Sequence, residues 1–295
     1  MRRLIDAIRH LQPKQIFFAC DGPVKDNHKQ KELVYLTRSQ INYIDWECDL
    51  RTRFRDINYG CCKGMSDAIT WFFENVNAGI ILEEDCIPHE DFIPYCNELL
   101  KKYEFDKRIW SINGTNFQDG KLRGDGSYYF SRYFQCWGWA TWKRSWQEYD
   151  ITMSAWNNLK KSDMINSIFD TKNELLYWNR VWDKLYFENK PDSWAYRFSF
   201  TSLINGGLSI IPNVNLVKNV GFDLDATNTR YSIEETSINR GILPLSHPMN
   251  IVRHKEADQY TFNTRFSFLS LKKIFMISLK KPFYYLKKLL RLIVN

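Results

Sequence analysis

The sequence contains no CxxC pair, and its seven cysteines form an odd count. This pattern argues against a disulfide framework, and the spacing of zinc ligands is also missing. Residues 1–15, MRRLIDAIRHLQPKQ, lack the apolar stretch of a secretory signal peptide. We therefore expect a reducing, cytoplasmic environment.

Acidic residues are absent from residues 262–295, which hold eight Lys or Arg. The net charge of +7 therefore belongs to this tail, because the preceding residues hold 33 basic and 34 acidic side chains. Basic residues are not concentrated in the body of the chain, so the composition argues against nucleic acid as a partner.

The apolar runs of the tail are too short to span a bilayer. Lys-Lys pairs at 272–273, 280–281 and 287–288 alternate with Leu, Ile and Phe, which is typical of a segment that lies on an anionic membrane surface. We predict a domain at 1–260 and a basic amphipathic tail at 261–295, peripheral on the inner face of the cell membrane. Alternatively, the tail packs on the domain or binds a partner protein.

The body shows no internal repeat or low-complexity linker. Short apolar runs alternate with amphipathic stretches: strands are predicted within 14–23, 48–60, 78–85 and 206–222, and helices at 2–11, 27–44, 62–76, 89–104 and 173–190. This alternation predicts an α/β layered fold. In open sheets of this kind, ligands bind beyond the carboxyl ends of the strands.

An acidic triplet (Glu83, Glu84 and Asp85) follows the predicted strand AGIIL. Like charges this close repel one another, and each loses hydration if the strand end is buried. A bound cation would compensate for both costs. The alternative is a role in capping the next helix, as Glu90 and Asp91 could also do.

Several motifs occur in an order that resembles a known family: CDGP, FRDINYGCCKG, IILEEDCIPHEDFIPYC, SINGTNF, WGWATWKRSW, NLVKNVGF and DATNT. Over residues 4–260 the chain resembles bacterial GT-A-fold glycosyltransferases of the hemolytic-protein-like group and, more distantly, N-acetylglucosaminyltransferase I. The resemblance implies a mixed, mainly parallel sheet flanked by helices. It also implies an inverting, metal-dependent enzyme that moves a sugar from a nucleotide diphosphate donor to a glycan or lipid-linked acceptor in surface polysaccharide synthesis.

The resemblance makes the acidic triplet the DxD-type element of such enzymes. Asp85, with Glu84, would bind Mn²⁺ or Mg²⁺, and the cation would bridge the donor's diphosphate. Glu83 and Glu84 would also face the donor. His247, in LSHP, would be a third metal ligand, or else a packed loop residue.

The resemblance also implies a nucleotide pocket. Asp21 would accept a hydrogen bond from the base, and Arg55, Asn58 and Lys63 would line the pocket at a helix start that favours phosphate. Asn116 would face the donor. The alternatives are an Asx turn at Asp21, a Gly-capped loop with a solvated lysine, and a turn closed by Asn116.

On the acceptor side, the resemblance points to Trp137, Gly138 and Trp139. Gly138 would permit close approach of the acceptor, and Trp137, Trp139 or Trp142 would stack on a sugar face. We expect at least one of these tryptophans to belong to the core.

Two departures from the family pattern bear on function. Relatives begin with a further strand that ends in Asn-Arg-Pro, so we expect a sheet that lacks its first strand and has exposed edges. Relatives also read Trp-Asp-Tyr where this chain has Ala195 after Trp194. Asp192 or Asp183 could replace this base, or each could be structural.

Two other functions fit part of the pattern. A degenerate, non-catalytic protein could bind carbohydrate or membrane through the same fold. A metal-dependent nucleotidyltransferase would share the acidic strand end, but it would also carry a Gly-rich, basic N-terminal loop, which this sequence does not show.

Overall fold

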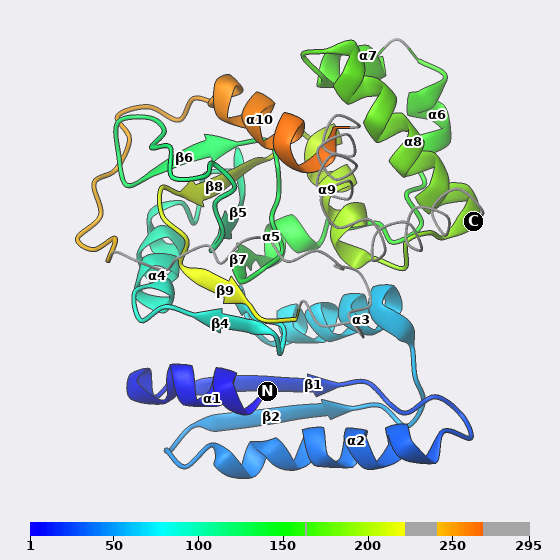
Figure 1. Ribbon diagram of the computed structural model, residues 1–295, viewed down its shortest axis with the longest axis vertical. Coiled ribbons are helices and arrows are strands. Elements are labelled where there is room, and N and C mark those ends of the chain that lie inside the picture. Colours follow the sequence, from blue (N-terminus) through cyan, green and yellow to red (C-terminus); the bar gives the residue numbers. More distant parts are fainter. Residues whose placement is uncertain (163, 222–240, 268–295) are drawn as a thin grey trace, which may run out of the picture.

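Figure 1 shows a computed structural model, in which residues 1–162, 164–221 and 241–267 are described. The motif DATNT and nearly all of the predicted tail lie outside the described residues. Among the described residues, no helix has the length and apolar character needed to cross a bilayer.

The structure confirms the α/β class. The helices are α1 (Arg2–Ile8), α2 (His28–Arg38), α3 (Gly60–Asn75), α4 (Phe92–Lys102), α5 (Lys143–Trp146), α6 (Trp156–Lys160), α7 (Met164–Ile168), α8 (Lys172–Glu188), α9 (Trp194–Ile204) and α10 (Lys255–Thr261). The strands are β1 (Gln15–Cys20), β2 (Asp49–Phe54), β3 (Ala78–Ile81), β4 (Cys86–Pro88), β5 (Ile109–Asn113), β6 (Tyr128–Ser131), β7 (Trp139–Trp142), β8 (Leu208–Pro212) and β9 (Val217–Asn219). Short turns of 3₁₀ helix follow α1 and α2 (Arg9–Leu11 and Ser39–Tyr43), and a π-helical turn (Phe262–Phe266) follows α10.

The central sheet has five strands in the order β3-β7-β5-β8-β6. Only β5 and β8 pair in parallel within it, and the other three pairings are antiparallel. The expectation of a mainly parallel sheet was therefore wrong. Parallel neighbours need a long crossover connection, whereas β7 follows β6 through a loop and enters between β3 and β5 antiparallel to both.

A separate layer at the foot of Figure 1 holds β1 and β2, which pair in parallel through the crossover helix α2. Helix α3 contacts both this layer and the central sheet. Phe72 meets the ring of Phe17 in β1 with centroids 5.0 Å apart, and a Cβ added to Gly79 in β3 would lie 2.2 Å from the Phe72 ring. Among the described residues β1 pairs only with β2 and β3 only with β7, so each has an unpaired edge.

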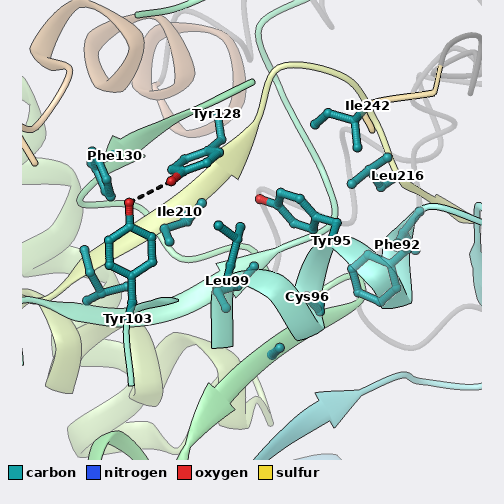
Figure 2. Packing of buried hydrophobic residues seen from close by; sticks show 14 of the residues in the cluster. Phe92, Tyr95, Cys96, Leu99, Tyr103, Tyr128, Phe130, Ile210, Leu216 and Ile242 are labelled. Atoms are coloured by element: carbon teal, nitrogen blue, oxygen red, sulfur yellow. Dashed lines mark hydrogen bonds between the residues drawn. The ribbon is translucent and has the colours of Figure 1, made fainter. Parts of the chain in front are cut away.

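The main core lies between α4 and the central sheet (Figure 2). The buried face of α4 carries Phe92, Tyr95, Cys96 and Leu99, which share one face because a helix turns every 3.6 residues. At the end of the helix, the Tyr103 hydroxyl hydrogen-bonds to that of Tyr128 in β6 at 2.7 Å. This packing holds α4 against the central sheet.

A second core joins the helices that follow β7. Trp156, Trp178 and Trp182 are its largest buried side chains, and Phe262 and Phe266 pack against the same cluster. The packed body therefore continues past the predicted boundary at 260 to the end of the π-helical turn.

A buried ion-pair network connects β6 to α8 and α10. The Arg132 side chain is 5% exposed and lies beside Asp170, Glu174 and Asp258. Arg253 pairs with Asp170 and Asp258 as well. Since Glu174 and Asp258 are fully buried, these charges depend on the two arginines for compensation.

Candidate functional site

Several polar segments meet at one end of the strands of the central sheet, where β3 and β5 end and β7 begins. Ile81 at the end of β3 and Asn113 at the end of β5 both pair with Trp139 at the start of β7. Strand β8 runs parallel to β5. Four segments therefore lie at the same end of the strands: the acidic triplet and residues 137–138, 114–117 and 213–215. Neighbouring strands are about 4.8 Å apart.

The acidic triplet forms the turn between β3 and β4. The Glu83 carbonyl accepts a hydrogen bond from the Cys86 amide at 3.0 Å, and the Asp85 carbonyl accepts one from the Val220 amide at 2.8 Å. A Cβ added to Gly221 would lie 2.1 Å from Asp85 Oδ2. The backbone of residue 221 thus lies against the Asp85 carboxylate, and a larger residue would displace it.

Burial and the neighbouring acids disfavour the ionised form of Glu83. Burial, and then the neighbouring charges of Asp85 and Glu84, raise the pKa of Glu83 to about 8, while a hydrogen bond with Trp194 opposes this shift. None of these causes is a lysine or arginine of the described chain. The Met1 ammonium does lie beside the triplet, where it donates to the Glu84 carbonyl at 3.3 Å.

A hard divalent cation at this turn would take its protein ligands from the carboxylates that solvent can reach. Glu84 is exposed and Asp85 partly exposed, so both can offer oxygen ligands, which Mg²⁺ and Mn²⁺ prefer. Within the described ranges, no group of three or more His, Cys, Asp or Glu is arranged to hold a metal. Mg²⁺ is commonly bound through one or two carboxylates, with substrate phosphates and water completing its shell, so Glu84 and Asp85 would suffice for a cation that arrives with a diphosphate.

His247 lies elsewhere, beside the C-terminal half of α4. Its Nε2 is 3.2 Å from Glu98 Oε1 and its Nδ1 is 3.0 Å from the Tyr128 hydroxyl. Burial and nearby Lys102 lower its pKa. None of its described contacts joins it to Asp85, and they match the alternative of a packed loop residue.

Asp21 is bound to the backbone. Its Oδ1 accepts hydrogen bonds from the amides of Gly22 at 2.9 Å and Tyr59 at 3.0 Å, and its Oδ2 accepts from Tyr59 at 2.9 Å and Gly60 at 3.1 Å. The Asx turn that was the alternative for this residue is wrong, because the amide two residues on would belong to Pro23, which has no N–H. The carboxylate instead joins β1 to the start of α3 through the amides of Tyr59 and Gly60. Both oxygens already have donors, which disfavours a contact with a nucleotide base.

Asp192 caps the same helix from far along the chain. Its Oδ2 accepts the Cys61 amide at 2.8 Å and its Oδ1 accepts the Cys62 amide at 3.2 Å. Two carboxylates thus satisfy the amides of residues 59–62, and their negative charge disfavours a phosphate at this helix start. The contacts give Asp192 a structural role.

The predicted pocket residues around this helix start are also engaged. Arg55 pairs with Asp67 on α3, and Asn58 Nδ2 donates to the Gly22 carbonyl at 3.0 Å. Lys63 Nζ lies 4.4 Å from the centre of the Tyr59 ring, and Arg55 lies over the same ring. Sequence reasoning did not single out Tyr59, because a lone aromatic in a loop carries no signal of its cationic neighbours.

Asp183 and Asn116 also have structural partners. Asp183 Oδ1 is 2.7 Å from Lys160 Nζ and accepts from Trp156 Nε1 at 3.2 Å, at the partly exposed surface of the helical core. Asn116 is buried, and its Oδ1 accepts the Gln118 amide at 2.7 Å, as expected of a residue that closes a turn.

The aromatic segment before and within β7 divides into core and surface. Trp139 is fully buried and stacks on Trp194 with centroids 5.3 Å apart, so it cannot contact an acceptor, and that expectation was wrong. Gly138 has φ +63, and a Cβ there would lie 2.5 Å from the Val217 side chain; glycine is required for this packing. Trp137 is partly exposed and meets the edge of Phe117, with centroids 5.5 Å apart.

Phe117 and Trp194 are site residues that sequence reasoning missed as such. Phe117 is partly exposed after β5, and the Arg265 guanidinium lies 4.8 Å from its ring centre. Trp194 connects Glu83 to the stacked core around Trp139. Only the fold reveals these contacts, since both partners are distant in sequence.

A cleft of about 540 Å³ lies away from the acidic triplet, along β6 and residues 248–256. A scan against protein-family models and a search of curated proteins gave no match to this chain.

Proposed function

We propose that this chain is a metal-dependent glycosyltransferase, which moves a sugar from a nucleotide diphosphate donor to a glycan or lipid-linked acceptor. A GT-A relationship, with inversion at the sugar carbon, is part of the proposal. The setting would be surface polysaccharide synthesis at the cytoplasmic face of the membrane. The order of the motifs along the chain supports this assignment.

The observation that carries the proposal is the crowding of the acidic triplet. Three acids meet at the end of β3, the pKa of Glu83 is raised to about 8, and no described basic side chain contributes to relieving this crowding. A divalent cation at Glu84 and Asp85 would relieve the repulsion. When bound, the cation would neutralise the charge of the leaving diphosphate.

Two chemically different groups lie at the ends of neighbouring strands of the sheet. The acidic triplet follows β3, while the partly exposed pair of Trp137 and Phe117 lies at β7 and β5. Aromatic faces present large apolar surfaces on which a sugar can stack. We therefore assign the diphosphate to the acids and the acceptor sugar to this aromatic pair.

The catalytic base is not assigned to Asp192 or Asp183. Asp192 is held by two backbone amides, and Asp183 by Lys160 and Trp156. These contacts do not bring the Asp192 or Asp183 side chain toward the acidic triplet.

The test is release of nucleoside diphosphate from UDP- and GDP-sugars with and without Mn²⁺. We expect Mn²⁺-dependent release by the parent and a loss of at least about a hundredfold in Asp85→Asn, because the cation and diphosphate lose a ligand. Asp49→Asn is the matched control, since Asp49 is an exposed acid of β2 paired with Arg51. Equal turnover by the parent and Asp85→Asn would contradict the proposal.

A second candidate is a non-catalytic protein that binds carbohydrate or membrane. The unpaired edges of β1 and β3 favour it, because a divided sheet could lack part of a donor site. Such a protein would retain glycan or vesicle binding and release no nucleoside diphosphate. A nucleotidyltransferase would instead release pyrophosphate from a nucleoside triphosphate and a sugar phosphate.

A further inference from the structure

Two loops of the body and the end of α10 form one continuous surface. The Asp119 carboxylate accepts hydrogen bonds from the Tyr260 hydroxyl and from Arg265, each at 2.9 Å. Lys121 Nζ lies 4.2 Å from the centre of the Tyr260 ring. Residues 119–121 are therefore fixed against the helix from which the basic tail continues.

The second loop, residues 243–252, packs against the same surface. The Ser127 amide donates to the Ser246 carbonyl at 2.7 Å, and the Met249 amide donates to Asp125 Oδ2 at 3.3 Å. The 540 Å³ cleft lies between these loops, with Gly124, Asp125 and Val252 among its lining residues. We call residues 119–126, residues 243–252 and the Tyr260–Arg265 turn the loop face.

The loop face exposes four large apolar side chains; Leu243 is 38% exposed, and the other three are exposed more strongly. Leu122 is 75% exposed, Met249 86% and Val252 69%. Side chains this exposed contribute little to the folded core, because their apolar area remains in water. They can therefore enter the apolar part of a bilayer without being removed from the folded core.

The charges of the loop face are mixed. Lys121 is exposed, but so are Asp119 and Asp125, and the neighbouring Lys255 and Glu256 add one exposed charge of each sign. The face itself therefore offers little net attraction for an anionic surface. The attraction comes from the sequence that follows Ser267, which holds seven Lys or Arg and no acid in residues 268–295.

We infer that the loop face docks on an anionic lipid bilayer, with Leu122, Met249 and Val252 inserting at the interface and the basic sequence of residues 268–295 supplying the electrostatic attraction. A basic segment attracts a protein to anionic lipid, and apolar side chains strengthen the contact by entering the acyl boundary. The two elements are linked in sequence, because the tail continues from Ser267 and Arg265 pairs with Asp119 of the loop face at 2.9 Å. The inference depends on the proposed membrane location and not on the proposed transfer reaction.

Helix α2 is the natural comparison, since it exposes Leu33 at 53% and Leu36 at 55%, and its neighbouring loop exposes Ile57 at 62%. In Figure 1, α2 lies at the foot of the molecule and α10 at the top. The α2 surface is thus remote from the point where the tail begins.

The test is co-sedimentation of the full chain with vesicles of phosphatidylcholine containing about 30% phosphatidylglycerol. We expect the variant Leu122→Ser/Met249→Ser/Val252→Ser to bind about tenfold more weakly than the parent, because it has lost three inserting side chains. The matched variant Leu33→Ser/Leu36→Ser/Ile57→Ser should bind as the parent does. Circular dichroism melting of both variants checks that each is folded.

Three results would overturn the inference: no vesicle binding by the parent, equal binding by the loop-face variant, or a loss confined to the α2 variant. The last result would assign the membrane surface to α2. The assay contains no sugar donor, so a failure here is distinct from a failure of nucleoside diphosphate release.

Discussion

The acids at the start of α3 differ from the acids at the end of β3 in what surrounds them. Asp21 and Asp192 accept hydrogen bonds from consecutive backbone amides. Glu83 has two acidic neighbours, and burial raises its pKa to about 8. The first pair completes a helix, whereas the raised pKa of Glu83 keeps this carboxyl group protonated at neutral pH.

This difference separates carboxylates that complete the fold from those that we propose to bind a cation. A carboxylate that accepts several backbone amides is stabilised in its charged form and contributes to folding. A crowded triplet without a basic partner costs folding energy, and such a cost is typical of sites that bind a ligand. The buried network around Arg132 is a third case, in which arginines compensate the acids.

The largest effect on stability is expected at Arg132. Arg132→Met leaves Glu174 and Asp258 buried with fewer cations, so urea unfolding should show a loss of about 3–5 kcal/mol. Arg108→Met is the control, because Arg108 is 60% exposed in its pair with Asp106, and such pairs contribute about 0–1 kcal/mol. Similar losses in the two variants would show that the network is not a compensated core.

Glu83 should make stability fall as pH rises. Its pKa is about 8 in the fold against 4.5 when unperturbed, so between these values the folded state retains a proton that the unfolded state has released. The free energy of unfolding should therefore decline from pH 5 to pH 8, by about 3 kcal/mol. Glu83→Gln should remove most of this decline in urea titrations at pH 5, 6, 7 and 8, and an unchanged slope would show that Glu83 is not the titrating group.

A smaller effect is expected at Asp192. Asp192→Ala removes the acceptor for two amides at the start of α3, and loss of a helix cap costs about 1 kcal/mol. Asp192→Asn keeps an acceptor oxygen and should lose less. Thermal unfolding of the two variants measures this difference, and if Asp192→Ala were as stable as the parent, the capping role would be wrong.

Local patterns predicted much of the fold. The apolar run at β3 and the amphipathic spacing of α3 and α4 all became the expected elements, because periodicity reports burial directly. Strands β4 and β9 were not separated from their surroundings, since three-residue strands depend on a partner distant in sequence. The antiparallel entry of β7 was likewise missed, because strand direction is decided by connections across the whole sheet.

The candidate site was predictable only where its residues are adjacent in sequence. Glu83, Glu84 and Asp85 could be recognised as crowded from the sequence alone. The partner amides of Asp192 belong to residues 61 and 62, more than a hundred positions away, and nothing local indicates them. Trp139 and Trp137 look alike in the motif, and only the stack on Trp194 shows which of them is buried.

Calorimetric titration of UDP and GDP, with and without Mn²⁺, tests the central claim most directly. The account predicts that one nucleotide binds the parent only when Mn²⁺ is present, that Asp85→Asn weakens this binding at least about tenfold by removing a cation ligand, and that Asp49→Asn leaves it intact. Binding that is independent of Mn²⁺, or equal in the parent and Asp85→Asn, would contradict it.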